Sequence, residues 1–125
     1  MSPNKKVVEK LGEGIDRLDR ETMLSCLADD VERVEWLDGN PNSGVPIRGK
    51  DVFIQNMDRP ADVIMKSETK RMTEENNVVV AESIVRLTKK DGSVLATIKA
   101  IDVMELENGK IKRIDAFTAE IKNSA

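Results

Sequence analysis

The N-terminal part of the chain repeats its apolar residues at helical spacing. They recur every three or four positions at Val7, Val8, Leu11, Ile15 and Leu18. With charged residues on the opposite face, this period predicts an amphipathic helix over residues 4–18. Asp19 then favours the start of a second helix, because an aspartate side chain at this place accepts hydrogen bonds from free N–H groups of the first turn. We expect that helix to end near residues 29–30.

The middle of the chain predicts shorter elements. A short strand is expected over 31–37, and the Gly-, Asn- and Pro-rich stretch 38–44 is typical of a loop. A third helix is expected over 50–57. Pro60 ends it, because proline lacks the backbone N–H that a continuing helix needs.

After Pro60 the period of the pattern changes to two. The segments that alternate or are rich in β-branched residues are 63–73, 78–88, 94–106 and 110–121. Asp91-Gly92 and Asn108-Gly109 favour type I′ hairpin turns, whose central residues both have positive φ, and 75–77 makes the third connection. Four antiparallel strands that follow three helices predict an α+β fold.

The strand expected over 94–106 is unusually long and has two different faces. At about 3.4 Å per residue its length approaches ~44 Å, so in a small domain it should bend around the helices and leave a hollow. Its inner positions are apolar except for Asp102: Ala96, Ile98, Ala100, Met104 and Leu106. We therefore expect the Asp102 carboxyl to face the hollow, where burial raises the pKa of an acid. The alternative is a structural carboxylate that pairs with Arg113, Lys99 or backbone donors of a neighbouring strand.

The outer positions of the same strand are also partly apolar. They are Leu95, Thr97, Lys99, Ile101, Val103 and Glu105. An antiparallel sheet that faces only water should be more polar. This pattern predicts a homodimer that packs through the outer sheet face.

Composition removes several classes of chemistry. The 125 residues include no histidine, no tyrosine and one cysteine, Cys26, so Ser–His and Cys–His nucleophilic sites and a His/Cys zinc site are excluded. A net charge of −3 with scattered basic residues argues against a nucleic-acid partner. No apolar run approaches the ~20 residues of a membrane helix, and the lone cysteine favours the reducing cytoplasm. We expect no metal, no cofactor and no membrane partner.

Three short motifs carry a resemblance to a known family. They are LADD (27–30), RGKD (48–51) and NGKI (108–111). In this order, at this chain length, they resemble the nuclear transport factor 2-like superfamily, in its SnoaL-like and ketosteroid-isomerase-like branch. The resemblance implies one domain over residues 1–125. Its fold is a cone in which three helices close a strongly bent, four- to six-stranded, mainly antiparallel sheet around an apolar pocket, commonly as a dimer.

The resemblance also nominates catalytic carboxylates. Ketosteroid isomerases use a carboxylic acid kept neutral by an apolar strand site, and Asp102 matches it. Their general base follows the motif at 27–30, which implies Glu35, or Asp38 after a short shift. Their oxyanion-hole tyrosine is absent, and Leu11 lies near its place. The other reading of Glu35 is a solvated carboxylate.

A further carboxylate comes from the last strand. SnoaL-type cyclases and limonene-type epoxide hydrolases carry a functional aspartate there, and Asp115 matches it. The other reading of Asp115 is a surface pair with Arg113. The Arg-x-Asp motif of the epoxide hydrolases is replaced by Ser83-Ile84-Val85, which disfavours epoxide hydrolysis.

One set of side chains is expected to form the wall of the pocket. It consists of Trp36, Phe53, Met57, Val85, Met104 and Phe117. Three function classes follow. The first is an acid–base isomerase, cyclase or dehydratase that acts on a small apolar carbonyl compound. The others are a non-catalytic pocket for a small apolar ligand, and a dimerising or regulatory domain with a vestigial pocket.

Overall fold

A computed structural model describes residues 1–122 of the chain. Residues 123–125, the end of the domain expected over 1–125, lie outside the described residues. The elements in chain order are α1 (Pro3–Arg17), α2 (Arg20–Cys26), β1 (Leu27–Trp36), β2 (Pro46–Arg48), α3 (Lys50–Asn56), β3 (Val63–Glu75), β4 (Val78–Lys89), β5 (Val94–Glu107) and β6 (Lys110–Glu120).

Local chemistry explains where the first two helices begin. The Ser2 hydroxyl accepts a hydrogen bond from the Lys5 backbone N–H at 3.1 Å, which caps α1. The predicted cap of α2 is confirmed, because the Asp19 carboxylate accepts from the Thr22 backbone N–H at 3.2 Å. The predicted end of this helix is wrong: α2 ends at Cys26, and β1 begins at the next residue.

The sheet has six strands in the order β2-β1-β6-β5-β4-β3. The expected antiparallel meander of β3, β4, β5 and β6 is confirmed. Two features extend the sheet beyond it. β1 joins β6 in parallel, and the short strand β2 pairs antiparallel with β1 at the sheet edge. The α+β class and the mainly antiparallel sheet are therefore confirmed.

The turns show where positive φ is needed. Both central residues have positive φ at Asn76-Asn77 and at Asn108-Gly109, as a type I′ turn requires. In the turn between β4 and β5, Gly92 has positive φ but Asp91 does not. The prediction of a type I′ turn at Asp91-Gly92 is therefore wrong. The Lys89 N–H instead donates to the Ser93 carbonyl across a longer loop.

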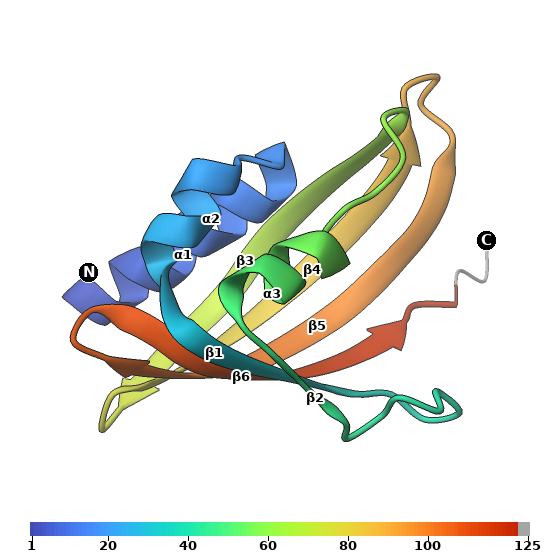
Figure 1. The fold of residues 1–125 in the computed structure, drawn as a ribbon. Helices are drawn as coiled ribbons and strands as arrows, with labels where there is room; N and C mark the ends of the chain where they lie inside the picture. Colours follow the sequence, from blue (N-terminus) through green and yellow to red (C-terminus); the bar gives the residue numbers. More distant parts are fainter. Residues whose placement is uncertain (123–125) are drawn as a thin grey trace.

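The helices cover one side of the curved sheet, which we call the inner face. Figure 1 shows α1 and α2 beside each other on the concave side of the sheet, with α3 near β1 and β2. The core lies between these layers and contains Leu11, Met23, Leu27, Phe53, Val79, Leu106 and Ile111. The opposite side of the sheet, the outer face, carries no helix in the described residues.

A bulge in β6 decides which of its side chains face inward. Glu105 pairs with Arg113 while the next residue, Leu106, pairs with Ile111, so Lys112 is an extra residue on β6. An extra residue transfers every later side chain to the opposite face. Ile114, Ala116 and Thr118 therefore face inward, and Asp115 and Phe117 face outward.

Candidate functional site

A cavity lies between α1, α3 and the inner face of the sheet. Its volume is about 400 Å³, which suits a small organic ligand. The apolar part of the wall includes Val8, Leu11, Ile15, Phe53, Met57, Met65, Met72, Ala81, Val85, Ile98, Ala100, Met104 and Ile114. Four of the six residues expected in the wall, Phe53, Met57, Val85 and Met104, therefore line it.

The two remaining wall candidates lie elsewhere, and their expected position is wrong. Trp36 and Phe117 are paired in register on β1 and β6, and their rings stack on the outer face with centroids 6.3 Å apart. Each side chain is exposed, Trp36 at 43% and Phe117 at 42%. The bulge in β6 explains the error for Phe117, and its pairing partner Trp36 faces the same way.

Asp102 lies where the alternation of β5 predicts it. Its neighbours Ala100 and Met104 on the same face line the cavity together with it. Within residues 1–122, no ion pair or hydrogen bond joins its carboxyl to a protein group, so the alternative pairing with Arg113 or Lys99 is not found. Burial raises the pKa of Asp102 to about 6, against a smaller lowering by the positive charge of Arg33.

Arg33 is a cavity residue that the sequence reasoning missed. Arg33 lines the cavity, and its guanidinium pairs with the Glu35 carboxylate at 3.1 Å. The Arg33 side chain is 17% exposed and that of Glu35 is 37% exposed. Along the end of β1, Arg33 and Glu35 alternate with apolar Val34 and Trp36, which marks a charged face of the strand, but the alternation alone does not say that this face turns inward.

The strand register brings Glu35 and Asp102 into one row of the inner face. Glu35 pairs with Ala116 on β6, and Ala116 pairs with Asp102 on β5. Neighbouring strands lie about 4.8 Å apart, so the two carboxylate-bearing backbones are roughly 10 Å apart with only a methyl side chain between them. Glu35 itself does not line the cavity; its partner Arg33 does.

Asp115 faces away from the cavity, so its expected position in the site is wrong. Its carboxylate accepts hydrogen bonds from the Arg113 guanidinium and from the Trp36 indole N–H, each at 3.0 Å. The hydrogen bonds from Arg113 and Trp36 hold the pKa of Asp115 below its usual value. The surface pair that the sequence left open is therefore the observed arrangement. Asp38, the other candidate for the base, is exposed beyond the end of β1.

α1 forms one wall of the cavity and is fastened to β3 by Asp16. The Asp16 carboxylate accepts from the Ser67 backbone N–H at 2.9 Å and from the Ser67 hydroxyl at 2.8 Å. Arg59 adds a donor to the Ile15 carbonyl at 3.0 Å, near the C-terminus of the helix. These contacts fix the helix over the cavity.

We expect Asp16→Ala to lower the free energy of unfolding by about 1–3 kcal/mol, because it leaves the Ser67 donors without their partner. Glu13→Ala is the matched control on the same helix. Its exposed pair with Arg17, at 3.7 Å, should contribute less than about 0.5 kcal/mol. Urea unfolding of both variants measures the difference, and equal losses would contradict the role given to Asp16.

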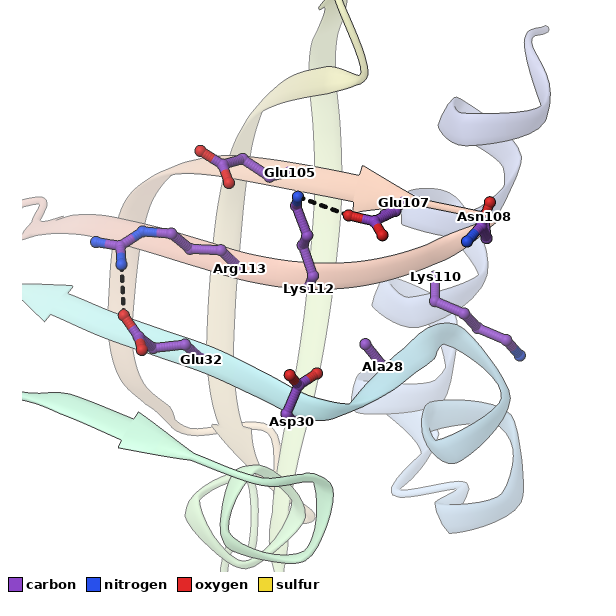
Figure 2. Close-up of a pocket in the computed structure, with 9 residues that line it drawn as sticks. All are labelled: Ala28, Asp30, Glu32, Glu105, Glu107, Asn108, Lys110, Lys112 and Arg113. Carbon is purple, nitrogen blue, oxygen red and sulfur yellow. Dashed lines mark hydrogen bonds and ion pairs between the residues drawn. The ribbon is translucent and has the colours of Figure 1, made fainter.

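A second hollow lies on the outer face, next to the β5–β6 turn. Its volume is about 510 Å³, and its lining is mostly charged. Figure 2 shows that several of these charges pair with one another: Lys112 with Glu107 at 2.9 Å, and Arg113 with Glu32. Because its charges neutralise each other on an open surface, this hollow is the weaker candidate for a ligand site.

Two further kinds of site receive no support from the described residues. No group of three or more His, Cys, Asp or Glu side chains could hold a metal ion in residues 1–122. Across the same residues, no helix is long and apolar enough to cross a membrane.

Comparison with known proteins identifies the family. Residues 8–114 match the family described as the SnoaL-like domain. The chain belongs to the SnoaL-like domain family. This agrees with the nuclear transport factor 2-like fold that the sequence motifs indicated. No curated protein matches the chain.

Solved structures share the fold of this SnoaL-like chain at low sequence identity. An LEH-like epoxide hydrolase of M. tuberculosis has a TM-score of 0.76 and 18% identity, with 94% of this chain and 83% of that chain covered. A proposed ketosteroid isomerase from Kribbella flavida DSM 17836 has a TM-score of 0.71 and 17% identity, covering 98% and 82%. IdmH, a proposed polyketide cyclase from Streptomyces antibioticus, has a TM-score of 0.73 and 15% identity, covering 92% and 91%. At these identities the likeness establishes the fold alone.

Proposed function

We propose that this SnoaL-like chain binds a small apolar carbonyl compound in the cavity and catalyses an acid–base isomerisation, cyclisation or dehydration through Asp102. The single observation that carries this proposal is a carboxyl group without a protein partner in an otherwise mostly apolar cavity. Glu35 is the second carboxylate of the proposed site. The domain would span residues 1–125, which the family match over 8–114 supports.

The chemistry follows from the protonation of Asp102. With a pKa of about 6, its carboxyl group exchanges protons close to neutral pH, where an acid or base catalyst is most effective. Glu35 differs because its carboxylate is paired with Arg33 and partly solvated. Two carboxyl groups in different surroundings can divide the roles of acid and base.

The names of structural neighbours support this reading of the cavity without assigning a substrate. They include a proposed isomerase and a proposed cyclase. TerC, which is 22% identical to this chain with a TM-score of 0.73, was co-crystallised with polyporic acid.

A non-catalytic ligand-binding domain is the second candidate. Asp115 lies outside the cavity and Glu35 does not line it. Asp102 is therefore the one carboxylate that the sheet contributes to the lining among the described residues. The other acidic residues of the lining, Glu9, Glu13 and Asp16, come from α1. A carboxyl group can orient a ligand without transferring a proton to it.

Hydrogen–deuterium exchange beside a carbonyl group separates the two candidates. The probe is 2-acetonaphthone, whose methyl protons exchange with D₂O when the ketone enolises. We expect the protein to accelerate this exchange and Asp102→Asn to reduce the acceleration by about 100-fold, the typical contribution of a positioned acid or base. NMR follows the loss of the methyl signal.

Asp115→Asn is the control, because it removes a carboxylate on the outer face and should leave the exchange rate unchanged. Binding of the ketone without accelerated exchange would support the non-catalytic candidate. Absence of both binding and exchange would contradict a cavity for apolar carbonyl compounds.

We also propose a homodimer that packs through the outer sheet face. The stacked pair of Trp36 and Phe117 supports this, because two exposed aromatic rings beside the apolar residues of β5 form an unusual surface for a monomer. Phe117→Lys should convert the dimer to a 13.9 kDa monomer, whereas Val52→Lys on the helical side should not. Sedimentation velocity distinguishes them, and a monomeric parent protein would contradict the dimer.

A cytoplasmic location remains a proposal as well. Its support is the single cysteine, Cys26, which is buried with a free thiol and whose pKa burial raises. Fractionation of cells that produce the protein tests the location.

A further inference from the structure

We propose that Arg33 binds the carbonyl oxygen of the ligand and polarises it. This inference rests on the proposed function and names the residue that would give the cavity its preference for carbonyl compounds. Neither the family motifs nor the residues nominated from the sequence include Arg33.

The first support is the unused hydrogen-bonding capacity of Arg33. A guanidinium has five N–H donors. Within residues 1–122, the one side-chain partner of Arg33 is Glu35, which takes a bond from Nη1. The side chain is nevertheless only 17% exposed, and it lines the cavity. None of its nitrogen atoms is both fully buried and without a partner, so the remaining donors have access to open space.

The second support is the position of Arg33 relative to Asp102. Arg33 pairs with Ile114 on β6, which pairs with Met104 on β5. Asp102 lies one inner-face position from Met104 on the same strand and lines the same cavity. The two charged groups act on each other, since the positive charge of Arg33 lowers the pKa of Asp102, yet they form no ion pair in the described residues. A donor and an acid thus lie near one another with space between them.

The third support is the anchoring of the guanidinium. Glu35 holds Nη1 at 3.1 Å, which fixes the orientation of a long side chain before a ligand arrives. When a carboxylate removes a proton from the carbon beside the carbonyl, negative charge develops on the carbonyl oxygen. A fixed cationic donor among apolar side chains stabilises that charge more strongly than water does.

The test compares two ligands that differ at one group. In 2-acetonaphthone a carbonyl replaces the first methylene of the side chain of 2-ethylnaphthalene, so shape and charge are nearly the same. We expect the protein to bind the ketone more tightly, and Arg33→Met to weaken ketone binding by about tenfold or more, as loss of a hydrogen bond from a charged donor does. Binding of 2-ethylnaphthalene should not change.

A spectroscopic readout reports the contact itself. The carbonyl ¹³C signal of labelled 2-acetonaphthone should move downfield on binding to the parent protein and should not move on binding to Arg33→Met. Arg33→Lys, which restores a cationic donor, should recover part of both the affinity and the shift. Arg48→Met is the matched control, because Arg48 pairs with Glu32 at 2.9 Å and its side chain is 74% exposed.

The outcomes separate this inference from the proposed function. If the parent protein bound both ligands with equal affinity, and Arg33→Met had the same affinities, the role of Arg33 would be overturned. The proposal that the cavity binds an apolar ligand would stand. A downfield shift on binding to Arg33→Met as large as that on binding to the parent protein would overturn the role of Arg33 as well. No binding of either ligand to the parent protein would overturn the proposed function, and this inference with it.

Discussion

Replacing Asp102 with asparagine is expected to raise the free energy of unfolding by about 2–3 kcal/mol at pH 8. Burial raises the pKa of this carboxyl from 3.8 to about 6, so at pH 8 the folded protein holds a charge that its surroundings disfavour. Each pKa unit corresponds to about 1.4 kcal/mol. Asparagine keeps the size of the side chain and removes the charge, which relieves the penalty.

The pH dependence of stability that Asp102 causes is opposite to that of a carboxylate whose pKa is lowered by folding. Because the folded pKa is raised, between about pH 3.8 and pH 6 the folded state retains a proton that the unfolded chain releases. The contribution of Asp102 therefore becomes less favourable as pH rises through this window and is constant above it. The difference between parent and Asp102→Asn should be small near pH 3.8 and reach its full size above pH 6. Urea unfolding at a series of pH values measures that difference.

Asp115→Asn supplies a control with the same chemical change and the opposite sign. Its carboxylate is stabilised by the hydrogen bonds from Arg113 and Trp36, so the substitution should lower the free energy of unfolding by roughly 1 kcal/mol at neutral pH. If Asp102→Asn also destabilised the protein at pH 8, the carboxylate would have a favourable partner in the folded state. The site described for Asp102 would then be wrong.

Local sequence signals predicted most of the fold and the orientation of Asp102. The spacing of apolar residues placed the first helix at 4–18, and the observed helix is Pro3–Arg17. The strand expected at 94–106 is observed as Val94–Glu107. Side chains alternate without interruption along the part of this strand that lines the cavity. Taking every second residue therefore placed Asp102 on the correct face of the sheet.

The same rule of alternation gave the wrong face for the residues of β6, because this strand contains a bulge. Asp115 and Phe117 share the parity of Ile111, which is buried in the core, so strict alternation along the strand would place all three on the inner face. The extra residue Lys112 reverses the faces beyond it. A bulge depends on how two strands pair, and a single strand contains no sufficient sign of it.

Arg33 was missed for a related reason. Its importance comes from the parallel pairing of β1 with β6, which brings Arg33 and Glu35 beside residues about 80 positions away. Alternation along β1 did place charged and apolar residues on opposite faces, but the charged face is the one that turns inward. Which face of β1 turns inward is decided only by the arrangement of the neighbouring strands.

Phe53→Ala is expected to have the largest effect on stability, a loss of about 3–5 kcal/mol in the free energy of unfolding. Phe53 is 2% exposed and belongs to the core cluster, and it also lines the cavity. Its removal therefore deletes buried apolar surface and joins new empty volume to an existing cavity. Urea unfolding gives the loss. Val52→Ala, one residue earlier on α3 and 39% exposed, should change stability by less than about 0.5 kcal/mol.

The enlarged cavity makes a second measurement possible. A ligand that binds only the folded state stabilises it according to its affinity and concentration. An apolar ligand such as 2-ethylnaphthalene can fill part of the space left by the phenyl ring, so it should raise the melting temperature of Phe53→Ala more than that of the parent protein. Equal stability of Phe53→Ala and Val52→Ala would contradict the burial of Phe53. A large loss of stability without any effect of the ligand would place Phe53 in the core alone, separate from the space that a ligand can enter.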